Sequence, residues 1–302
     1  MSLKPWILAA RPKTLGAAIA PVMVGSALGW RLSGDFCVWL MLATLGSCVC
    51  LQIAVNFFND AVDGLKGSDT KERLGPVRIT ASGMMPPATV LKVGAGVLVL
   101  ATLLAVPLVW MRGWPIIAIG IPSLYFCYGY TGGPWPLAYR GLGELFVVLF
   151  FGLIAVTGSA FVQSGQWHVE ALVAGLQIGM LSTVLIAINN LRDVDEDRKT
   201  GKKTLAVRFG VTFARLEIAG LLIGSFLMGV YWLPRMPLGM FVALQIIVLF
   251  TLLILNDLRK PPSSAYNQTL AKAGACLLLY SIAFTISLVL VKGGAWAQGY
   301  GH

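Results

Sequence analysis

Long apolar segments alternate with short polar stretches along the whole 302-residue chain. A helix that crosses a bilayer needs about 20 consecutive, mostly apolar residues. By this criterion we predict spans over residues 14–31, 38–57, 88–110, 114–132, 142–163, 169–190, 213–233, 237–256 and 269–291. The pattern therefore predicts an all-α fold, a polytopic membrane bundle of nine transmembrane helices that forms one domain over residues 1–302.

Composition and charge support a membrane location. The chain is 57% hydrophobic and only 12% charged, whereas soluble domains carry about 25% charged residues. When the predicted spans are threaded in order, 19 of the 23 Lys and Arg residues fall on one side, and the other side holds Arg31, Arg112, Arg235 and Lys292. The positive-inside rule then places the N-terminus in the cytoplasm and the C-terminus outside, in the inner membrane of the cell. Topology thus accounts for the net charge of +10 without a nucleic-acid partner.

Two short stretches hold eight of the 13 acidic residues. They are NFFNDAVDGLKGSDTKER, from Asn56 to Arg73, and NNLRDVDEDRKTGKKT, from Asn189 to Thr204. Each follows a predicted span that ends on the cytoplasmic side, so the two stretches can face one another. Ordinary solvated loops would also mix acids and bases, but polar residues that begin inside the ends of spans are costly and are usually functional.

The polar residues recur at helical spacing in both stretches. In the first, the pattern i, i+3, i+4, i+7 is followed by Asn56, Asn59, Asp60 and Asp63. In the second, the pattern i, i+3, i+4, i+7, i+8 is followed by Asn189, Arg192, Asp193, Glu196 and Asp197. Each set shares one face if an α-helix continues through it, and Asp195 then points away from that face.

The residue types indicate a metal–phosphate site. Carboxylate and amide oxygens are hard ligands that suit Mg²⁺ or Ca²⁺, and none of the five cysteines has a metal-binding spacing. Mg²⁺ takes one or two protein carboxylates and completes its shell with waters and substrate phosphates. The lysines and arginines around both stretches can bind the remaining phosphate oxygens.

These residues resemble the motifs of the UbiA superfamily of intramembrane prenyltransferases. The first motif reads NDAVD from Asn59 to Asp63, and the second reads DVDED from Asp193 to Asp197. Gly67 stands where the family carries a further acid. The stretches RPKTL, RLGPVR, YRGLGE and NNLRDVDEDRKTGKKTLAVRFG extend the resemblance over nearly the whole chain. They look like the branch that prenylates 1,4-dihydroxy-2-naphthoate in menaquinone synthesis.

The resemblance implies a central cavity open to the cytoplasmic side and a Mg²⁺-dependent reaction. A polyprenyl group would pass from polyprenyl diphosphate to 1,4-dihydroxy-2-naphthoate with loss of diphosphate and CO₂, giving demethylmenaquinone. The implied metal ligands are Asn59, Asp63, Asp193 and Asp197, and Asp60 joins these three acids as a catalytic candidate. The implied diphosphate-binding cations are Lys66, Arg73, Arg78, Arg140 and Lys203. The implied acceptor or prenyl pocket contains Gln52, Asn56, Tyr139 and Asn189. No obligatory protein partner is expected.

Two alternatives stay open at this point. The same fold could prenylate another acceptor, such as 4-hydroxybenzoate or homogentisate. A secondary transporter could also carry paired acidic motifs, although transporters place such groups near the bilayer midplane, whereas these acids lie at one membrane face.

Overall fold

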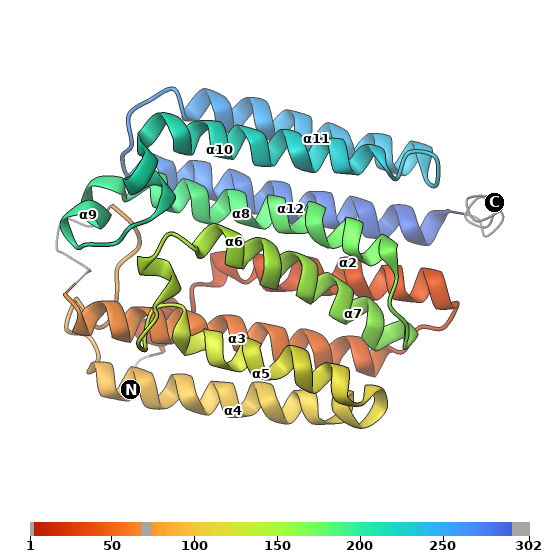
Figure 1. Ribbon diagram of the computed structural model, residues 1–302, viewed down its shortest axis with the longest axis horizontal. Helices are drawn as coiled ribbons and strands as arrows, with labels where there is room; N and C mark the ends of the chain where they lie inside the picture. Colours follow the sequence, from red (N-terminus) through yellow and green to blue (C-terminus); the bar gives the residue numbers. More distant parts are fainter. Residues whose placement is uncertain (1–2, 68–73, 292–302) are drawn as a thin grey trace.

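The computed structural model describes residues 3–67 and 74–291, and every regular element in these ranges is helical. The long helices lie side by side along one common direction (Figure 1). The elements are α1 (Lys4–Ala10), η1 (Pro12–Thr14), α2 (Gly16–Ser33), α3 (Val38–Leu65), α4 (Pro87–Arg112), α5 (Trp114–Gly129), η2 (Leu137–Tyr139), α6 (Gly143–Val147), the π-helical η3 (Val148–Ile154), α7 (Ala155–Ser164), α8 (Val169–Arg192), α9 (Val194–Lys199), α10 (Leu205–Val230), α11 (Pro237–Asp257) and α12 (Tyr266–Leu290).

Within the described residues, seven helical stretches are long and apolar enough to cross a membrane, which confirms a multi-pass helical membrane protein. They are α3, α4, the continuous α6–η3–α7, α8, α10, α11 and α12. The segment Lys4–Thr14 and α2 form a pair bent by 49°, which adds an eighth span if the pair is counted as one. Helix α5 has only 16 residues, fewer than a straight span needs. The predicted total of nine spans therefore stays a prediction.

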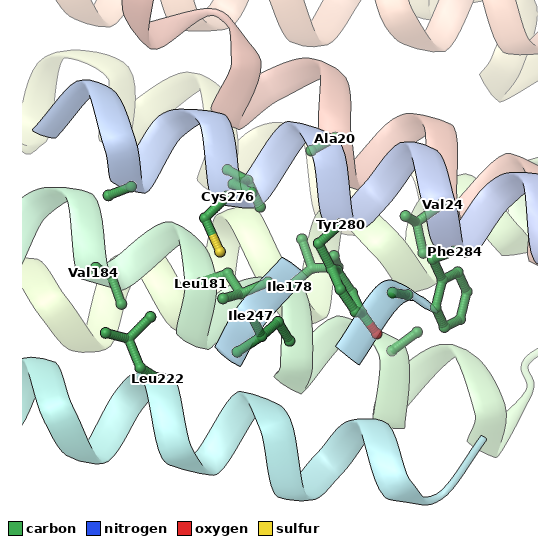
Figure 2. Close-up of a cluster of buried hydrophobic side chains, with 14 of the residues drawn as sticks. Ala20, Val24, Ile178, Leu181, Val184, Leu222, Ile247, Cys276, Tyr280 and Phe284 are labelled. Atoms are coloured by element: carbon green, nitrogen blue, oxygen red, sulfur yellow. The ribbon is translucent and has the colours of Figure 1, made fainter. Parts of the chain in front are cut away.

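One apolar core joins α2, α8, α10, α11 and α12. Figure 2 shows how its side chains meet, with Ile178 and Leu181 of α8 between Leu222 of α10 and the α12 residues Tyr280 and Phe284. All five are at most 2% exposed. This half of the bundle packs as a solid core, and the large cavity described below lies in the other half.

Helices α2 and α7 approach so closely that only glycine fits between them. A Cβ atom on Gly25 would lie 2.4 Å from the carbonyl oxygen of Val156, and one on Gly29 would lie 2.5 Å from that of Ala160. Small residues of this kind allow membrane helices to pack backbone against backbone. The contact fixes α7, one wall of the cavity, against the solid core.

The helices that carry the two acidic stretches end differently. Helix α3 runs well past the predicted span end at residue 57 and reaches Leu65, so the first polar set does share one helical face. Helix α8 stops at Arg192, and Asp193 has non-helical angles of φ −95° and ψ 10° before α9 begins. The second set therefore spans a helix break, although the backbone N–H of Asp197 still donates to the carbonyl of Asp193 at 2.8 Å.

We expect Gly25→Ala to destabilise the protein by about 1–3 kcal/mol, because the added methyl group forces α2 and α7 apart. A lower melting temperature in detergent would check this. The matched control is Gly96→Ala on the exposed side of α4, where an added Cβ meets nothing within 4 Å. That change should leave the melting temperature equal or higher, since alanine is the better helix former by about 1 kcal/mol. Equal melting temperatures for wild type and Gly25→Ala would contradict the packing argument.

Candidate active site

The two acidic stretches meet around the ammonium group of Lys202. Its Nζ lies 3.3 Å from Oδ2 of Asp63 on α3 and 4.0 Å from Oδ1 of Asp197 on α9. The end of α3, the end of α8 and all of α9 lie at the same end of the bundle (Figure 1). The prediction that the two stretches can face one another is therefore confirmed.

Asp63 is the most heavily contacted acid of this cluster. It is 3% exposed, and its Oδ2 also lies 3.4 Å from Nη2 of Arg78. The hydroxyl of Tyr139 donates to the other oxygen, Oδ1, at 2.9 Å. Two cations and a phenol thus converge on one buried carboxylate.

The second stretch contributes a buried charge network. Arg192 is 1% exposed and binds Asp193 through two hydrogen bonds, from Nε at 2.7 Å and from Nη2 at 2.6 Å. The same guanidinium donates to the side-chain oxygens of Asn189 at 2.8 Å and Asn267 at 2.6 Å. Asp195 instead lies in solvent with 80% of its side chain exposed, as its helical position predicts.

Burial and neighbouring charges shift the ionisation of two groups at this cluster. Burial raises the pKa of Asp197 to about 7; Lys202 opposes that rise, and the nearby carboxylates of Asp193, Glu196 and Asp63 add to it. Partial burial lowers the pKa of Lys66, with Asp63 opposing the change and Lys202 adding to it. A cation bound beside Asp197 would oppose the rise in the pKa of that carboxyl group, as Lys202 does.

The donor set fits a magnesium ion. Within residues 3–67 and 74–291, no three His, Cys, Asp or Glu side chains are arranged as a metal cage. Mg²⁺ does not need one, because it takes one or two carboxylates and completes its shell with waters and phosphate oxygens. Asp63 and Asp197 supply two carboxylates around one ammonium group. Asn59 stands one turn before Asp63 on α3, and its side-chain oxygen accepts a hydrogen bond from the hydroxyl of Thr131.

A cavity of about 800 Å³ begins beside this cluster and extends between α3, α4, α5 and the α6–η3–α7 stretch. Gln52, Asn56, Asn59 and Tyr130 are among its few polar lining residues. Asn56 also donates from Nδ2 to the carbonyl oxygen of Ala10 at 2.9 Å, which ties α3 to the N-terminal bend. Most of the remaining lining is apolar.

Three phenylalanines in mutual ring contact form part of the cavity wall near its polar end. The ring of Phe126 lies 4.5 Å from that of Phe146 and 5.5 Å from that of Phe150, and Phe146 and Phe150 stack at 5.0 Å. All three line the cavity. Aromatic faces of this kind exclude water and attract positive charge.

Some predicted site residues lie away from the carboxylate cluster, and others lie at the cluster but outside the cavity. The guanidinium of Arg140 stacks on Trp135 at 3.8 Å and is exposed. Lys203 is exposed and meets the site only through its backbone N–H, which donates to the carbonyl of Tyr139 at 3.3 Å. Asn189 and Tyr139 bind charged groups of the cluster and are not among the residues that line the cavity. Arg73 lies outside the described residues.

Comparison with known proteins places this geometry in a family. The UbiA prenyltransferase family matches residues 18–274. The chain belongs to this family. Curated UbiA relatives named "1,4-dihydroxy-2-naphthoate octaprenyltransferase" include one from Mycobacterium tuberculosis, 38% identical over 73% of this chain and 75% of that protein. One from Haemophilus influenzae is 37% identical over 71% of this chain and 72% of its own length.

A solved structure supports the fold. A UbiA homolog from Archaeoglobus fulgidus bound to GPP and Mg²⁺ superposes with a TM-score of 0.69 at 14% identity, covering 95% of this chain and 100% of that one. UbiA membership confirms the predicted enzyme class, a prenyltransferase, and leaves the transporter alternative without support.

The sequence reasoning missed some residues at this UbiA site. Lys202, and not its neighbour Lys203, bridges the carboxylates. Glu144 is 5% exposed and accepts a hydrogen bond from Asn190 at 2.6 Å, while its second oxygen has no hydrogen-bond partner in the described parts of the chain. Tyr130, which lines the cavity, has its pKa raised by burial first and then by the charges of Glu144, Asp63 and Asp197. An acid inside a predicted span at Glu144 was the available signal.

We expect Arg192→Met to destabilise the protein by about 3–5 kcal/mol, because it leaves the Asp193 carboxylate buried without its partner. Arg198→Met is the matched control, since its pair with Asp195 is exposed on both sides and should contribute about 0–1 kcal/mol. Melting temperatures in detergent compare the two. Equal losses in the two variants would mean that the buried pair is not what holds α8, α9 and α12 together.

Proposed function

We propose that this protein transfers a polyprenyl group from polyprenyl diphosphate to 1,4-dihydroxy-2-naphthoate, with loss of diphosphate and CO₂. The direct product is the hydroquinone demethylmenaquinol, which air oxidises to demethylmenaquinone. Relatives with this acceptor in their names match 71–74% of the chain at 36–38% identity in three cases. Agreement at that level over most of both chains supports a shared donor and acceptor class.

The observation that carries the proposal is the position of Asn59. It lines the apolar cavity and lies one helical turn from Asp63, at which Arg78 and Lys202 converge. A molecule with an anionic head and a long apolar tail fits this junction, with the head at the cations and the tail in the cavity. A polyprenyl diphosphate has this shape and charge distribution.

The charged residues would bind the diphosphate head. Asp63 and Asp197 would hold Mg²⁺, with the amide oxygen of Asn59 as a further ligand, and Asp193 would join them when Arg192 releases it. Bound Mg²⁺ supplies positive charge that neutralises the departing diphosphate. Lys202, Arg78 and Lys66 would donate charge-assisted hydrogen bonds to the phosphate oxygens.

The apolar part of the site would protect the reacting carbon. Loss of diphosphate leaves an allylic cation that water would consume. The rings of Phe126, Phe146 and Phe150 exclude water beside the polar end of the cavity and present π faces to positive charge. The electron-rich naphthoate ring would then attack the cation and afterwards lose CO₂.

We also infer that the site lies at the cytoplasmic face of the inner membrane. The distribution of Lys and Arg over the predicted loops supports this orientation, and it would let a water-soluble naphthoate and Mg²⁺ reach the carboxylates directly. The whole chain would then act as one integral-membrane domain.

The proposal is tested by incubating the purified protein with polyprenyl diphosphate, Mg²⁺ and a panel of aromatic acceptors. Demethylmenaquinone should form from 1,4-dihydroxy-2-naphthoate in preference to products of 4-hydroxybenzoate or homogentisate. Asp63→Asn should lower turnover at least about 100-fold, as expected when a charge that stabilises the transition state is removed. Preference for a different acceptor would overturn the acceptor assignment, and no prenylated product from folded protein would overturn the enzyme reaction.

Neighbouring lysines supply an internal control for that assay. Lys202→Gln should lower kcat/KM roughly 10- to 100-fold, which corresponds to one hydrogen bond to a charged group. Lys203→Gln, one residue along and exposed, should change it by less than about twofold. Equal losses would contradict the assignment of Lys202 to the diphosphate site.

We expect Gly158→Phe to discriminate against long donors. Gly158 lines the cavity from α7, which lies toward the end of the bundle away from α9 (Figure 1), and the nearest atom to an added Cβ is Ile119 Cδ1 at 3.4 Å. A phenyl ring there should fill the path of a long tail, so kcat/KM should fall about 100-fold for a long polyprenyl donor and much less for geranyl diphosphate. Gly220→Phe on the exposed side of α10 is the matched control. Equal losses for both donor lengths would argue against a tail in this cavity.

A further inference from the structure

The carboxylate of Asp60 binds backbone N–H groups of the loop that follows α3. Asp60 is 1% exposed, and its two oxygens accept hydrogen bonds from the backbone N–H groups of Ile79 at 3.1 Å and Thr80 at 3.0 Å. The Thr80 hydroxyl lies 2.7 Å from Oδ1 of the same carboxylate. The same hydroxyl lies 2.6 Å from the backbone carbonyl oxygen of Asp60, so Thr80 binds Asp60 through its backbone N–H and through a hydroxyl that can donate to either oxygen.

We propose that Asp60 is a positioning residue, which holds the loop after α3 so that Arg78 is set against Asp63 and completes the diphosphate site. This inference rests on the proposed function. It gives Asp60 a role different from that of Asp63, the proposed metal ligand, although both acids stand in the first motif.

The geometry of this loop links the Asp60 carboxylate to the position of Arg78. Arg78 directly precedes the two residues whose N–H groups bind Asp60, and it is 7% exposed with Nη2 at 3.4 Å from Asp63. Ile79 is 0% exposed in an apolar cluster with Phe57 and Val90. Backbone hydrogen bonds from Ser82 to Arg78 and from Met85 to Ile79 close the loop into a compact turn. Because Ile79 and Thr80 are anchored on α3, the backbone of Arg78 is held where its guanidinium can contact Asp63.

Gly64 completes the attachment from the next turn of α3. A Cβ at this position would lie 2.4 Å from Oγ1 and 3.0 Å from Cβ of Thr80. Thr80 can therefore approach α3 closely enough to reach Asp60 only because position 64 has no side chain. A Gly64→Ala change should therefore also loosen the loop, and it leaves every carboxylate of the motif in place.

The experiment measures binding of inorganic diphosphate in the presence of Mg²⁺ to the full-length protein in detergent, by titration calorimetry. Asp60→Asn, Gly64→Ala and Thr80→Val should each weaken diphosphate binding about tenfold, which is the loss expected for one misplaced charge-assisted hydrogen bond. In an Arg78→Gln background the same three changes should produce no further loss. Thr80→Ser, which keeps the hydroxyl, should bind like the wild type.

Steady-state kinetics separate positioning from a general loss of structure. Each loosening variant should raise KM for the polyprenyl donor by the same factor while kcat, KM for the aromatic acceptor and the Mg²⁺ concentration for half-maximal rate stay unchanged. Asp195→Asn is the matched control, since that acid is exposed in the second motif. Melting temperatures report folding, and the Thr80→Val and Thr80→Ser pair decides the question if Asp60→Asn does not fold.

Two results would overturn the proposal. The first is a raised Mg²⁺ requirement in Asp60→Asn with Gly64→Ala and Thr80→Val behaving like the wild type, which would make Asp60 a metal ligand. The second is full additivity of the losses in diphosphate affinity with the loss caused by Arg78→Gln, which would mean that the loop attachment acts independently of Arg78. Calorimetry needs no acceptor, so diphosphate binding that depends on Asp60 through Arg78 would stand even if the protein failed to make demethylmenaquinone.

Discussion

Two buried carboxylates from distant parts of the chain share one ammonium group, and the architecture of the site depends on that arrangement. Asp63 and Asp197 are 3% and 7% exposed, and such charges are unfavourable in a protein interior unless opposite charge lies close by. Lys202 supplies it to both. Asp63 and Lys202 are 139 residues apart in the chain, so this contact joins the end of α3 to the segment that follows α9. The hydrogen bonds of Tyr139 to Asp63 and of the Lys203 backbone to Tyr139 add the loop with Tyr139.

The fold places strong charge and a dry apolar space directly beside one another. Cations and carboxylates gather where the helices end, and the cavity continues from Asn59 into the half of the bundle that is not filled by the α2–α8–α12 core. A reaction that creates a leaving anion and a carbon cation benefits from this division. In the proposed reaction the anion would stay with the cations, while the carbon cation would stay among the phenylalanine rings, away from water. The same division explains why so apolar a protein keeps its few acids together.

The sequence predicted those features that local periodicity controls. Asn56, Asn59 and Asp63 share a face because α3 continues through them, and Asp195 is exposed because it lies on the opposite side of α9. The bend at Asp193 was not visible, since α8 ends there on a residue that is itself held by Arg192. The number of spans could not be predicted from hydropathy alone, because hydropathy does not show that the segment after Gly113 forms a helix of only 16 residues.

Contacts between loops were beyond prediction for a physical reason. Lys202 and Lys203 are chemically identical neighbours, yet the first lies among the carboxylates and the second is exposed. Backbone hydrogen bonds from Lys202 to Asp197 and from Lys203 to Tyr139 hold this segment in place. Asp60 has the spacing of a metal ligand, yet its partners come from Ile79 and Thr80, which no helical repeat on α3 can indicate. Residue type and spacing therefore located the site, while tertiary contacts decided the part that each residue plays.

The π-helical turn η3 has a consequence for how the cavity wall is built. A π turn is an α-helix that has accommodated one extra residue, and each residue advances an α-helix by roughly 100°. Removing that residue would rotate everything beyond it, turning Gly158 and Val162 of α7 out of the cavity and moving Val156 and Ala160 away from the glycines of α2. The π turn thus sets the rotation of α7 relative to α6. As a result, the first half of this continuous helix presents phenylalanines to the cavity, and the second half presents a close-packing surface to α2.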